Sequence, residues 1–405
     1  MRRRDFLGTT GAAGLGTLFF AGRNPLLAGT GKKKGNPAAM PILVVVFQRG
    51  AMDGLAAVQP LEDPYLGSMR PNLILKAGGE EGLLDLGGGF GLHPALAPLH
   101  PAYRSGKMAV VHGVGLPDAV RSHFDAQALM ESGKGGGNAG QDGWLNRVLG
   151  QLPHQEGPFR AVALEATMPL ALYGANQALA VADISRFGKD LARASRYSAL
   201  LGHNAQSLGE EVTAAQLEQL LKLTPKRIKT GNGPQYPNQR LGKALQQVAG
   251  LIKAGMAPQI AFVNAEGWDT HRGQGAARGA FFRAARPMAA ALSAFWQDLA
   301  EYQHRLVVLT MTEFGRTVAQ NGSGGTDHGR GSCFLVLGDK VAGGRVHGEV
   351  PSLKKTNLAD GRDLPVSVDY RSVLAGLLKN HLQIPKPAAI FPGWRGKPLK
   401  LFSPG

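Results

Sequence analysis

The stretch ILVVVF at residues 42–47, followed directly by QRGAMDG at residues 48–54, indicates the fold class of this chain. An unbroken apolar run rich in Val and Ile is typical of a strand that is covered on both faces. Strands of this kind belong to parallel sheets, which bind ligands beyond the carboxyl ends of their strands. The stretch therefore predicts a buried strand with polar residues at the edge where ligands bind.

Five further apolar runs resemble the first and predict buried strands. They are Met108–Val111, Ala161–Leu164, Ile260–Val263, Leu306–Thr310 and Phe334–Leu337. Helical patterns lie between them, and the clearest covers residues 277–302, where apolar residues recur every three or four positions. Pro287 is expected to kink or split that helix. Strands alternating with helices predict an α/β fold with a mostly parallel central sheet and helices on both faces.

The pattern changes between about residues 185 and 253, where two helical stretches flank a basic segment rich in Pro, Gly and Asn. We interpret these residues as a helical insertion rather than a separate domain. The sequence then predicts a single domain over residues 41–405.

The chain begins Met1-Arg2-Arg3-Arg4-Asp5-Phe6-Leu7, which matches the core of a twin-arginine export signal. A weakly apolar stretch rich in Gly and Ala follows, and it is too short to span a membrane. We expect residues 1–28 to form the signal and residues 29–40 a loose leader. The chain is then a cargo of the twin-arginine export machinery and is periplasmic or otherwise exported, without a transmembrane segment.

The formal charge of +16 favours anionic partners, and a solvated basic surface without a specific partner explains it equally. The basic residues are scattered without interleaved aromatics, which argues against a nucleic-acid groove. The Gly-rich loops 135–140 and 322–325 carry no nucleotide-binding pattern, and Cys333 is the only cysteine. Both features argue against an exported redox or cofactor protein, the least favoured class.

Polar residues follow the predicted strands at four places, and a fifth cluster precedes the last strand. The clusters are residues 48–54, 121–125, 264–271, 312–316 and 325–329. In a parallel sheet the first four must meet at one edge, at the carboxyl ends of the strands. Asp, His and Glu converging there are the ligand types of zinc, manganese or a similar divalent ion.

Five phrases in this order resemble a known family: RGAMDGL, SHFDAQ, GWDTH, TEFGRT and GTDHGRG. The family is the one catalogued as domain of unknown function 1501, and the resemblance extends from about Pro41 to Leu382. That family is regarded as a distant relative of the alkaline phosphatase and sulfatase superfamily. The resemblance implies an alkaline-phosphatase-like α/β domain that hydrolyses phosphate or sulfate esters with the help of metal ions.

The resemblance also implies metal ligands. Asp269, His271 and His328 correspond to a first metal site, which would hold one zinc, manganese or calcium ion. Asp53 and Glu313 correspond to a second site. Phe314 stands where the superfamily has a histidine ligand, so that second site lacks a ligand.

The catalytic residues implied by the resemblance are Ser122 as nucleophile and Arg121 or Arg316 as stabilisers of the developing charge. Structural roles compete with these: Ser122 with Asp125 resembles a helix capping box, and Arg316 can pair with Glu313. The leading hypothesis is an exported metal-dependent hydrolase of an anionic ester. The alternative is a non-catalytic relative that binds an acidic polysaccharide, another polyanion or a cell-envelope component, and Phe314 favours it.

Overall fold

The structure is a computed structural model that describes residues 19–21, 40–137, 139–153, 159–184, 233–256 and 258–403. Most of the predicted export signal and leader lies outside these ranges, as do residues 185–232 of the predicted insertion. Residues 19–21 of the predicted signal form a short strand at one edge of the main sheet.

A ten-stranded mixed sheet forms the centre of the described chain. Its strands, in order across the sheet, are β1 (Phe19–Ala21), β8 (Ala178–Ala180), β7 (Ala161–Ala163), β9 (Ile260–Ala265), β2 (Ile42–Gln48), β10 (Leu306–Thr312), β11 (Ser332–Gly338), β6 (Met108–Gly115) and β12 (Val346–His347), with β13 (Val368–Asp369) also paired to β6. All six predicted strands are present, as β2, β6, β7, β9, β10 and β11. A separate small sheet contains β3 (Val58–Pro60), β5 (Phe90–Leu92) and β4 (Leu84–Gly87).

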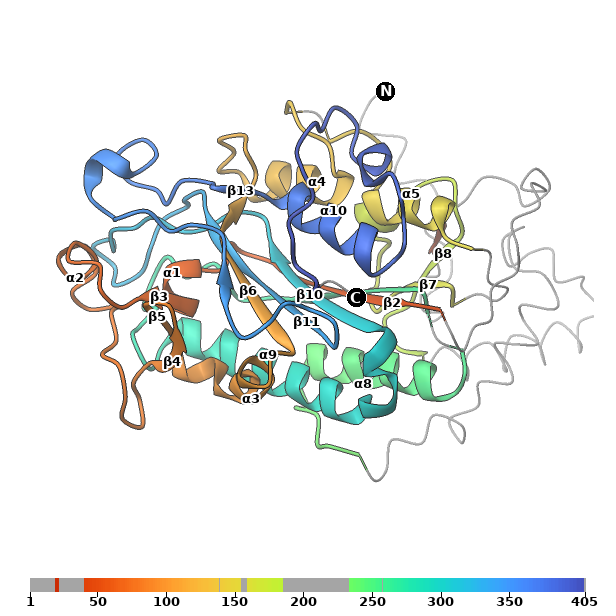
Figure 1. Ribbon diagram of the computed structural model, residues 1–405, viewed down its shortest axis with the longest axis horizontal. Coiled ribbons are helices and arrows are strands. Elements are labelled where there is room, and N and C mark those ends of the chain that lie inside the picture. The colour runs from red at the N-terminus through yellow and green to blue at the C-terminus, as the bar shows by residue number, and fades with distance from the viewer. Residues whose placement is uncertain are drawn as a thin grey trace, which may run out of the picture.

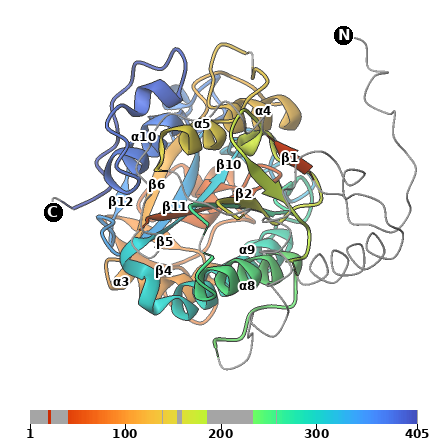
Figure 2. The same cartoon turned by 90° about the vertical axis from the view of Figure 1, so that its right-hand side faces the viewer.

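Helices cover both faces of the main sheet (Figures 1 and 2). One face carries α4 (His123–Ser132), α5 (Trp144–Gln151) and α10 (Tyr370–Asn380), and the other carries α3 (His100–Arg104), α8 (Arg240–Lys253) and α9 (Ala280–Asp298). Short helices α1 (Gly54–Ala57) and α2 (Leu66–Met69) and the 3₁₀ turns at 94–99, 170–172, 300–305, 355–357 and 387–390 complete the described elements. The predicted α/β class with a mostly parallel sheet is confirmed.

Strand β2 explains why both faces are covered. Ile42, Val44 and Val46 pack in the core beneath α8 and α9, whereas alternate residues such as Leu43 and Phe47 pack beneath α4, α5 and α10. Side chains alternate between the two faces of a strand, so a continuously apolar strand needs an apolar layer on each side. All of these side chains are at most 1% exposed.

Helix α9 is continuous through Pro287, so the predicted split does not occur. A proline inside a helix frees the carbonyl four residues earlier, here that of Arg283. Arg283 is exposed, and water can hydrogen bond to its carbonyl. The cost of the proline is therefore small enough for packing of the apolar helix face to outweigh it.

The direction of β11 is important for the rest of the molecule. Strands β8, β7, β9, β2 and β10 run parallel to one another, but β11 is antiparallel to both of its neighbours, β10 and β6. The start of β11 therefore lies at the same edge as the ends of β2, β6, β9 and β10. Residues before β11 and residues after the other four strands meet at that edge.

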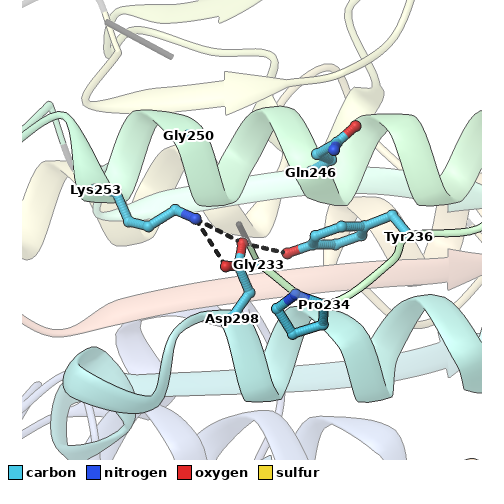
Figure 3. A pocket seen from close by; sticks show the side chains of 7 residues that line it. All are labelled: Gly233, Pro234, Tyr236, Gln246, Gly250, Lys253 and Asp298. Atoms are coloured by element: carbon cyan, nitrogen blue, oxygen red, sulfur yellow. Dashed lines mark hydrogen bonds and ion pairs between the residues drawn. The ribbon is translucent and has the colours of Figure 1, made fainter. Parts of the chain in front are cut away.

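A small hollow between α8 and the end of α9 is occupied by paired groups (Figure 3). Both carboxylate oxygens of Asp298 accept from Lys253 Nζ at 2.8 Å, and one also accepts from the Tyr236 hydroxyl at 2.9 Å. Burial and the Asp298 charge raise the pKa of Tyr236. The residues that line the hollow thus satisfy one another, and we interpret it as an anchor for the segment that precedes α8.

Candidate metal centre

Four chain segments bring ionisable side chains to the carboxyl edge of the sheet. His123 begins α4 after β6, Asp269 follows β9 and Glu313 follows β10. His328 precedes β11 and reaches the same edge because that strand is antiparallel. The predicted convergence of the clusters that follow β6, β9 and β10 is confirmed, and His328 adds an imidazole to them.

His123, Asp269 and His328 form a group that is able to hold a metal ion, because one donor atom of each lies within 4.8 Å of the others. Oδ1 of Asp269 is 3.7 Å from Nε2 of His123 and 3.6 Å from Nε2 of His328. Two ligands of a tetrahedral zinc ion lie roughly 3.3 Å apart when each bond is about 2.0–2.1 Å long. The Asp269 oxygen is thus spaced from each imidazole nitrogen almost as two ligands of one ion are.

His271 borders this group. Its Nε2 lies 3.2 Å from Oδ1 of Asp269 and 2.9 Å from Nε2 of His328. These distances also match neighbouring ligands of one ion. His271 is therefore a further candidate ligand, in agreement with the sequence-based prediction.

The second ring nitrogen of each histidine is held by an oxygen. Nδ1 of His123 is 2.8 Å from Oε1 of Glu313, and Nδ1 of His328 is 2.8 Å from the carbonyl oxygen of Arg121. Carboxylate and carbonyl oxygens only accept, so both Nδ1 atoms carry a proton, and the lone pair of the neutral form of each ring is then at Nε2. Metal-binding histidines are oriented in this way.

The same holds for His271, whose Nδ1 is 3.1 Å from Oδ1 of Asp327. The hydrogen bond from Asn321 is the largest of the effects that lower the pKa of Asp327, so this carboxylate is ionised and accepts. When both rings are neutral, the Nε2 atoms of His271 and His328 face each other with lone pairs only 2.9 Å apart. Such a pair is repulsive unless a cation, either a proton or a metal ion, lies beside both atoms.

Nε2 of His123 is buried and has no hydrogen-bond partner among the described residues. A buried polar atom without a partner costs free energy comparable to a lost hydrogen bond. A metal ion beside Asp269 would satisfy it.

Glu313 orients the ring of His123. It is fully buried, and its Oε1 accepts from His123, from Nε2 of Gln127 at 2.9 Å and from the Gly50 amide at 2.9 Å. Burial alone would raise the pKa of Glu313, but these hydrogen bonds outweigh burial and hold its pKa below the usual range. The hydrogen bond that His123 donates to Glu313 in turn raises the pKa of His123. In this arrangement Glu313 therefore acts as a positioning residue behind His123.

Arg316 holds Asp269. The Arg316 side chain is 0% exposed, and its Nη2 donates to Oδ1 of Asp269 at 2.5 Å. Burial would raise the pKa of Asp269, but Arg316 and the nearby imidazoles lower it below the usual range. The remaining donors of Arg316 go to backbone carbonyls of Gly50, Ala51, Trp268 and Thr326. This guanidinium is committed to the protein, which gives Arg316 a supporting role.

His123, Asp269, His271 and His328 together are called the metal centre below. Phe314 forms an apolar wall on one side of this centre, and solvent lies on another side. Its ring is buried and stacks on His123 with ring centroids 5.0 Å apart, and it packs against His328 at 5.1 Å. The side chains of Asp269 and His271 are 49% and 39% exposed. The centre is thus held from the protein side and remains accessible to a ligand from the other.

Asp53, the other predicted ligand, has different partners in this structure. Its carboxylate caps α1, forms an ion pair with Arg70 at 2.7 Å and accepts from Gln274 at 2.7 Å. Both charged side chains of the ion pair are at most 2% exposed. The contacts of Asp53 are those of a buried structural group.

We predict that Asp53→Ala lowers the free energy of unfolding by about 3–5 kcal/mol, because it leaves the buried Arg70 without its partner. Metal content per folded molecule should not change. Urea denaturation and elemental analysis measure the two quantities. Asp339→Ala is the matched control, because its pair with Lys107 is more than a third exposed and should contribute less than about 1 kcal/mol. Loss of the metal without loss of stability would instead make Asp53 a ligand.

Ser122 and Arg121 lie beside the centre, with contacts that explain them structurally. Ser122 is the N-cap of α4, is exposed, and accepts from the Asp125 amide at 3.5 Å, as the capping interpretation predicts. The Arg121 guanidinium pairs with Asp360 at 2.7 Å and with the buried Asp363 at 2.6 Å. Its clearest contribution to the centre is the backbone carbonyl that orients His328.

His123 is the member of the centre that the sequence did not single out. It lies inside the phrase SHFDAQ, where Ser122 received the functional role. The available signal was its spacing from Gln127: residues four apart share one helix face, and both contact Glu313. Only the position of Glu313 in space reveals that this face is directed toward the centre.

We expect Glu313→Gln to weaken metal binding by about 10–100-fold, the usual effect of changing the partner of a ligand histidine. The amide keeps an acceptor but removes the charge that holds the His123 proton on Nδ1. A competition titration with a zinc-binding dye measures the change. The exposed Glu301→Gln should bind zinc as the wild type does. Equal affinity in Glu313→Gln would show that His123 is not held through this carboxylate.

Fold and site together define a class: an α/β protein with a histidine and carboxylate cluster at the carboxyl edge of its sheet. The chain matches the family described as "Protein of unknown function (DUF1501)" over residues 93–389, which is well over half of its length. It belongs to this family. A comparison with curated proteins finds no match. None of the helices in the described part of the chain combines the length and apolarity needed to cross a bilayer.

Proposed function

We propose that this chain is an exported protein that binds one divalent metal ion at the centre and hydrolyses phosphate or sulfate esters there. The observation that carries the proposal is the orientation of the three histidines. His123, His271 and His328 each have Nδ1 held by an oxygen, and Nε2 of each lies 3.2–3.7 Å from Oδ1 of Asp269. A purely structural cluster would not need three lone pairs to converge.

Zinc is the ion that this donor set favours. Imidazole nitrogens combined with one carboxylate oxygen are typical zinc ligands, whereas calcium prefers oxygen ligands alone. Manganese accepts the same groups but favours more oxygen donors. We therefore propose zinc as the resident ion, with manganese as the next candidate.

A bound divalent ion supplies Lewis-acid chemistry toward an ester oxygen or a water molecule. The residues of the chain do the rest. Glu313 and the Arg121 carbonyl fix the rings of His123 and His328, and Phe314 excludes water from one side. The exposed hydroxyl of Ser122 at the start of α4, or a water molecule, is the proposed nucleophile, because a helix N-terminus favours a developing anion.

The substrate is proposed to be anionic. The formal charge of +16 attracts phosphate and sulfate groups from solution. The proposed relation to alkaline phosphatases and sulfatases agrees with the mostly parallel sheet and with a site at its carboxyl edge. Export rests on the twin-arginine pattern of residues 2–7 and remains part of the proposal.

Elemental analysis of the protein purified without chelators tests the metal. About one equivalent of zinc, followed by turnover of aryl phosphate or sulfate esters that a chelator abolishes, is the expected result. Absence of zinc and manganese after incubation with both ions would overturn the proposal. Appearance of the chain only in the cytoplasmic fraction, or its export after Arg3 and Arg4 are replaced by Lys, would overturn the twin-arginine route.

The second candidate function is a non-catalytic relative that binds an anionic ligand at the same metal ion. Phe314 favours it, because a buried phenyl ring occupies a place beside His123 and His328 where a second metal site would need a ligand. Stoichiometric zinc without turnover of any ester, but with binding of sulfated polysaccharide, would favour this function over the first.

A further inference from the structure

Phe124 is an exposed aromatic side chain directly after a candidate metal ligand. It lies in the first turn of α4 and is 87% exposed. The other exposed large hydrophobic residues in the described part of the chain are Tyr65 at 37% and Tyr173 at 53%, and both carry a hydroxyl that water can hydrogen bond. Among the described residues from Met40 onward, Phe124 is therefore the one large and wholly apolar side chain left in water.

Helix geometry places Phe124 next to the stripe of α4 that faces the metal centre. His123 and Gln127 both contact Glu313, so their stripe of α4 faces the centre. Successive helix residues are rotated by about 100°, which places Phe124 on the neighbouring stripe, and its exposure shows that this stripe faces solvent. The core-facing stripe lies on the opposite side, where Ala126 and Leu129 are buried.

The tilt of helical side chains also affects the position of the Phe124 ring. Cα–Cβ bonds in a helix tilt toward its N-terminus. The N-terminus of α4 is the end that meets the centre, because the Arg121 carbonyl just before it contacts His328. The Phe124 ring therefore leans toward the end of α4 that meets the centre, where Asp269 and His271 are exposed.

The exposed Phe124 ring lacks the favourable transfer out of water that stabilises the nearby buried ring of Phe314. A ligand with a flat apolar face would recover part of that transfer when its charged group binds at the metal centre, since ring faces stack on one another and on other flat apolar surfaces. Small alkyl groups offer much less contact area.

We propose that Phe124 is the platform for the organic group of the substrate, so that the centre takes esters whose alcohol portion is a ring rather than a small alkyl chain. The inference rests on the proposed function, because it assumes that an anionic group binds at the centre. It adds the substrate class: phosphate or sulfate esters of an aromatic or sugar ring.

Binding of two non-hydrolysable anions to the zinc-loaded full chain tests the platform. Phenylphosphonate should bind about three- to tenfold more tightly than methylphosphonate, the range expected for one ring contact. Phe124→Ala should reduce this ratio to about one with unchanged zinc content, and Phe124→Trp should keep it. Tyr173→Ala, which removes another exposed aromatic, is the matched control and should keep it too. Benzenesulfonate and methanesulfonate provide the same comparison for sulfuryl groups.

The outcomes separate this inference from the proposed function. If the protein hydrolyses esters but binds phenylphosphonate and methylphosphonate equally well, the platform alone is overturned. An unchanged ratio of these two affinities in Phe124→Ala has the same consequence. Zinc-loaded protein that binds neither anion overturns the proposed ester site and the platform with it. A preference for glucose 6-phosphate over glycerol 3-phosphate that Phe124→Ala removes would assign a sugar ring to the substrate. A preference for phenylphosphonate without a preference for glucose 6-phosphate would assign an aromatic ring.

Discussion

His328→Ala is expected to reduce bound zinc from about one equivalent to none after gel filtration. The substitution removes the ligand whose Nε2 lies 3.6 Å from Oδ1 of Asp269 and 2.9 Å from Nε2 of His271. Zinc bound by four protein ligands contributes about 10–16 kcal/mol, so one ligand accounts for roughly a quarter of that, or at least about a hundredfold in affinity. Elemental analysis and a dye competition titration measure the loss.

The exposed His304→Ala serves as the control, since it removes a histidine just before the start of β10, the end of that strand opposite the centre. Zinc should also stabilise the wild type against heat, because an ion that binds only the folded state adds about 4 kcal/mol at a thousandfold excess over its dissociation constant. His328→Ala should show no such shift. A variant that keeps its zinc at unchanged affinity would remove His328 from the ligand set.

Arg316→Met is expected to lower the free energy of unfolding by about 3–5 kcal/mol. The side chain is 0% exposed and donates to Asp269 and to the carbonyls of Gly50, Ala51, Trp268 and Thr326. Methionine fills a similar length but donates nothing, so several buried carbonyls lose a partner at once. We expect a lower midpoint of urea denaturation with an unchanged slope.

Arg283→Met is the matched control, because Arg283 is exposed on α9 and its replacement should change stability by less than about 0.5 kcal/mol. The loss of Arg316 also frees the Asp269 carboxylate that it holds, so zinc affinity should fall in the same variant. Wild-type stability in Arg316→Met, combined with a loss of turnover alone, would instead support the catalytic role that the family resemblance implies.

Much of the architecture is readable from local pattern. All six apolar runs in the sequence correspond to strands of the main sheet, because a strand buried on both faces has no polar positions to interrupt it. The helix at 280–298 is equally clear from its apolar stripe, and Pro287 misleads only where it predicts a break. The antiparallel direction of β11 is not readable, since an apolar run does not record which way its neighbours point.

The candidate site divides in the same way. Asp269, His271 and His328 were predicted as ligands because the resemblance named them, and the end of a predicted strand placed the first two of them at the sheet edge. His123 was missed, and the predictions for Asp53, Ser122, Arg121 and Arg316 meet structural contacts that compete with their functional roles. Spacing along the sequence identifies a polar residue at a strand end. It does not identify the group with which that residue forms an ion pair or a hydrogen bond.

The sequence by itself determined the α/β class, the strands and the edge at which polar residues collect, since strands buried on two faces are continuous apolar runs and polar residues follow them directly in the chain. Only the tertiary structure decided that His328 joins that edge through the antiparallel β11, that Glu313 and Arg316 support the centre from behind, and that His123 faces Asp269. The physical reason is that hydrogen bonds and ion pairs here join residues from about 50 to more than 200 positions apart, as between Arg316 and Asp269 or His328 and Arg121. Such contacts depend on packing in three dimensions and have no local signature.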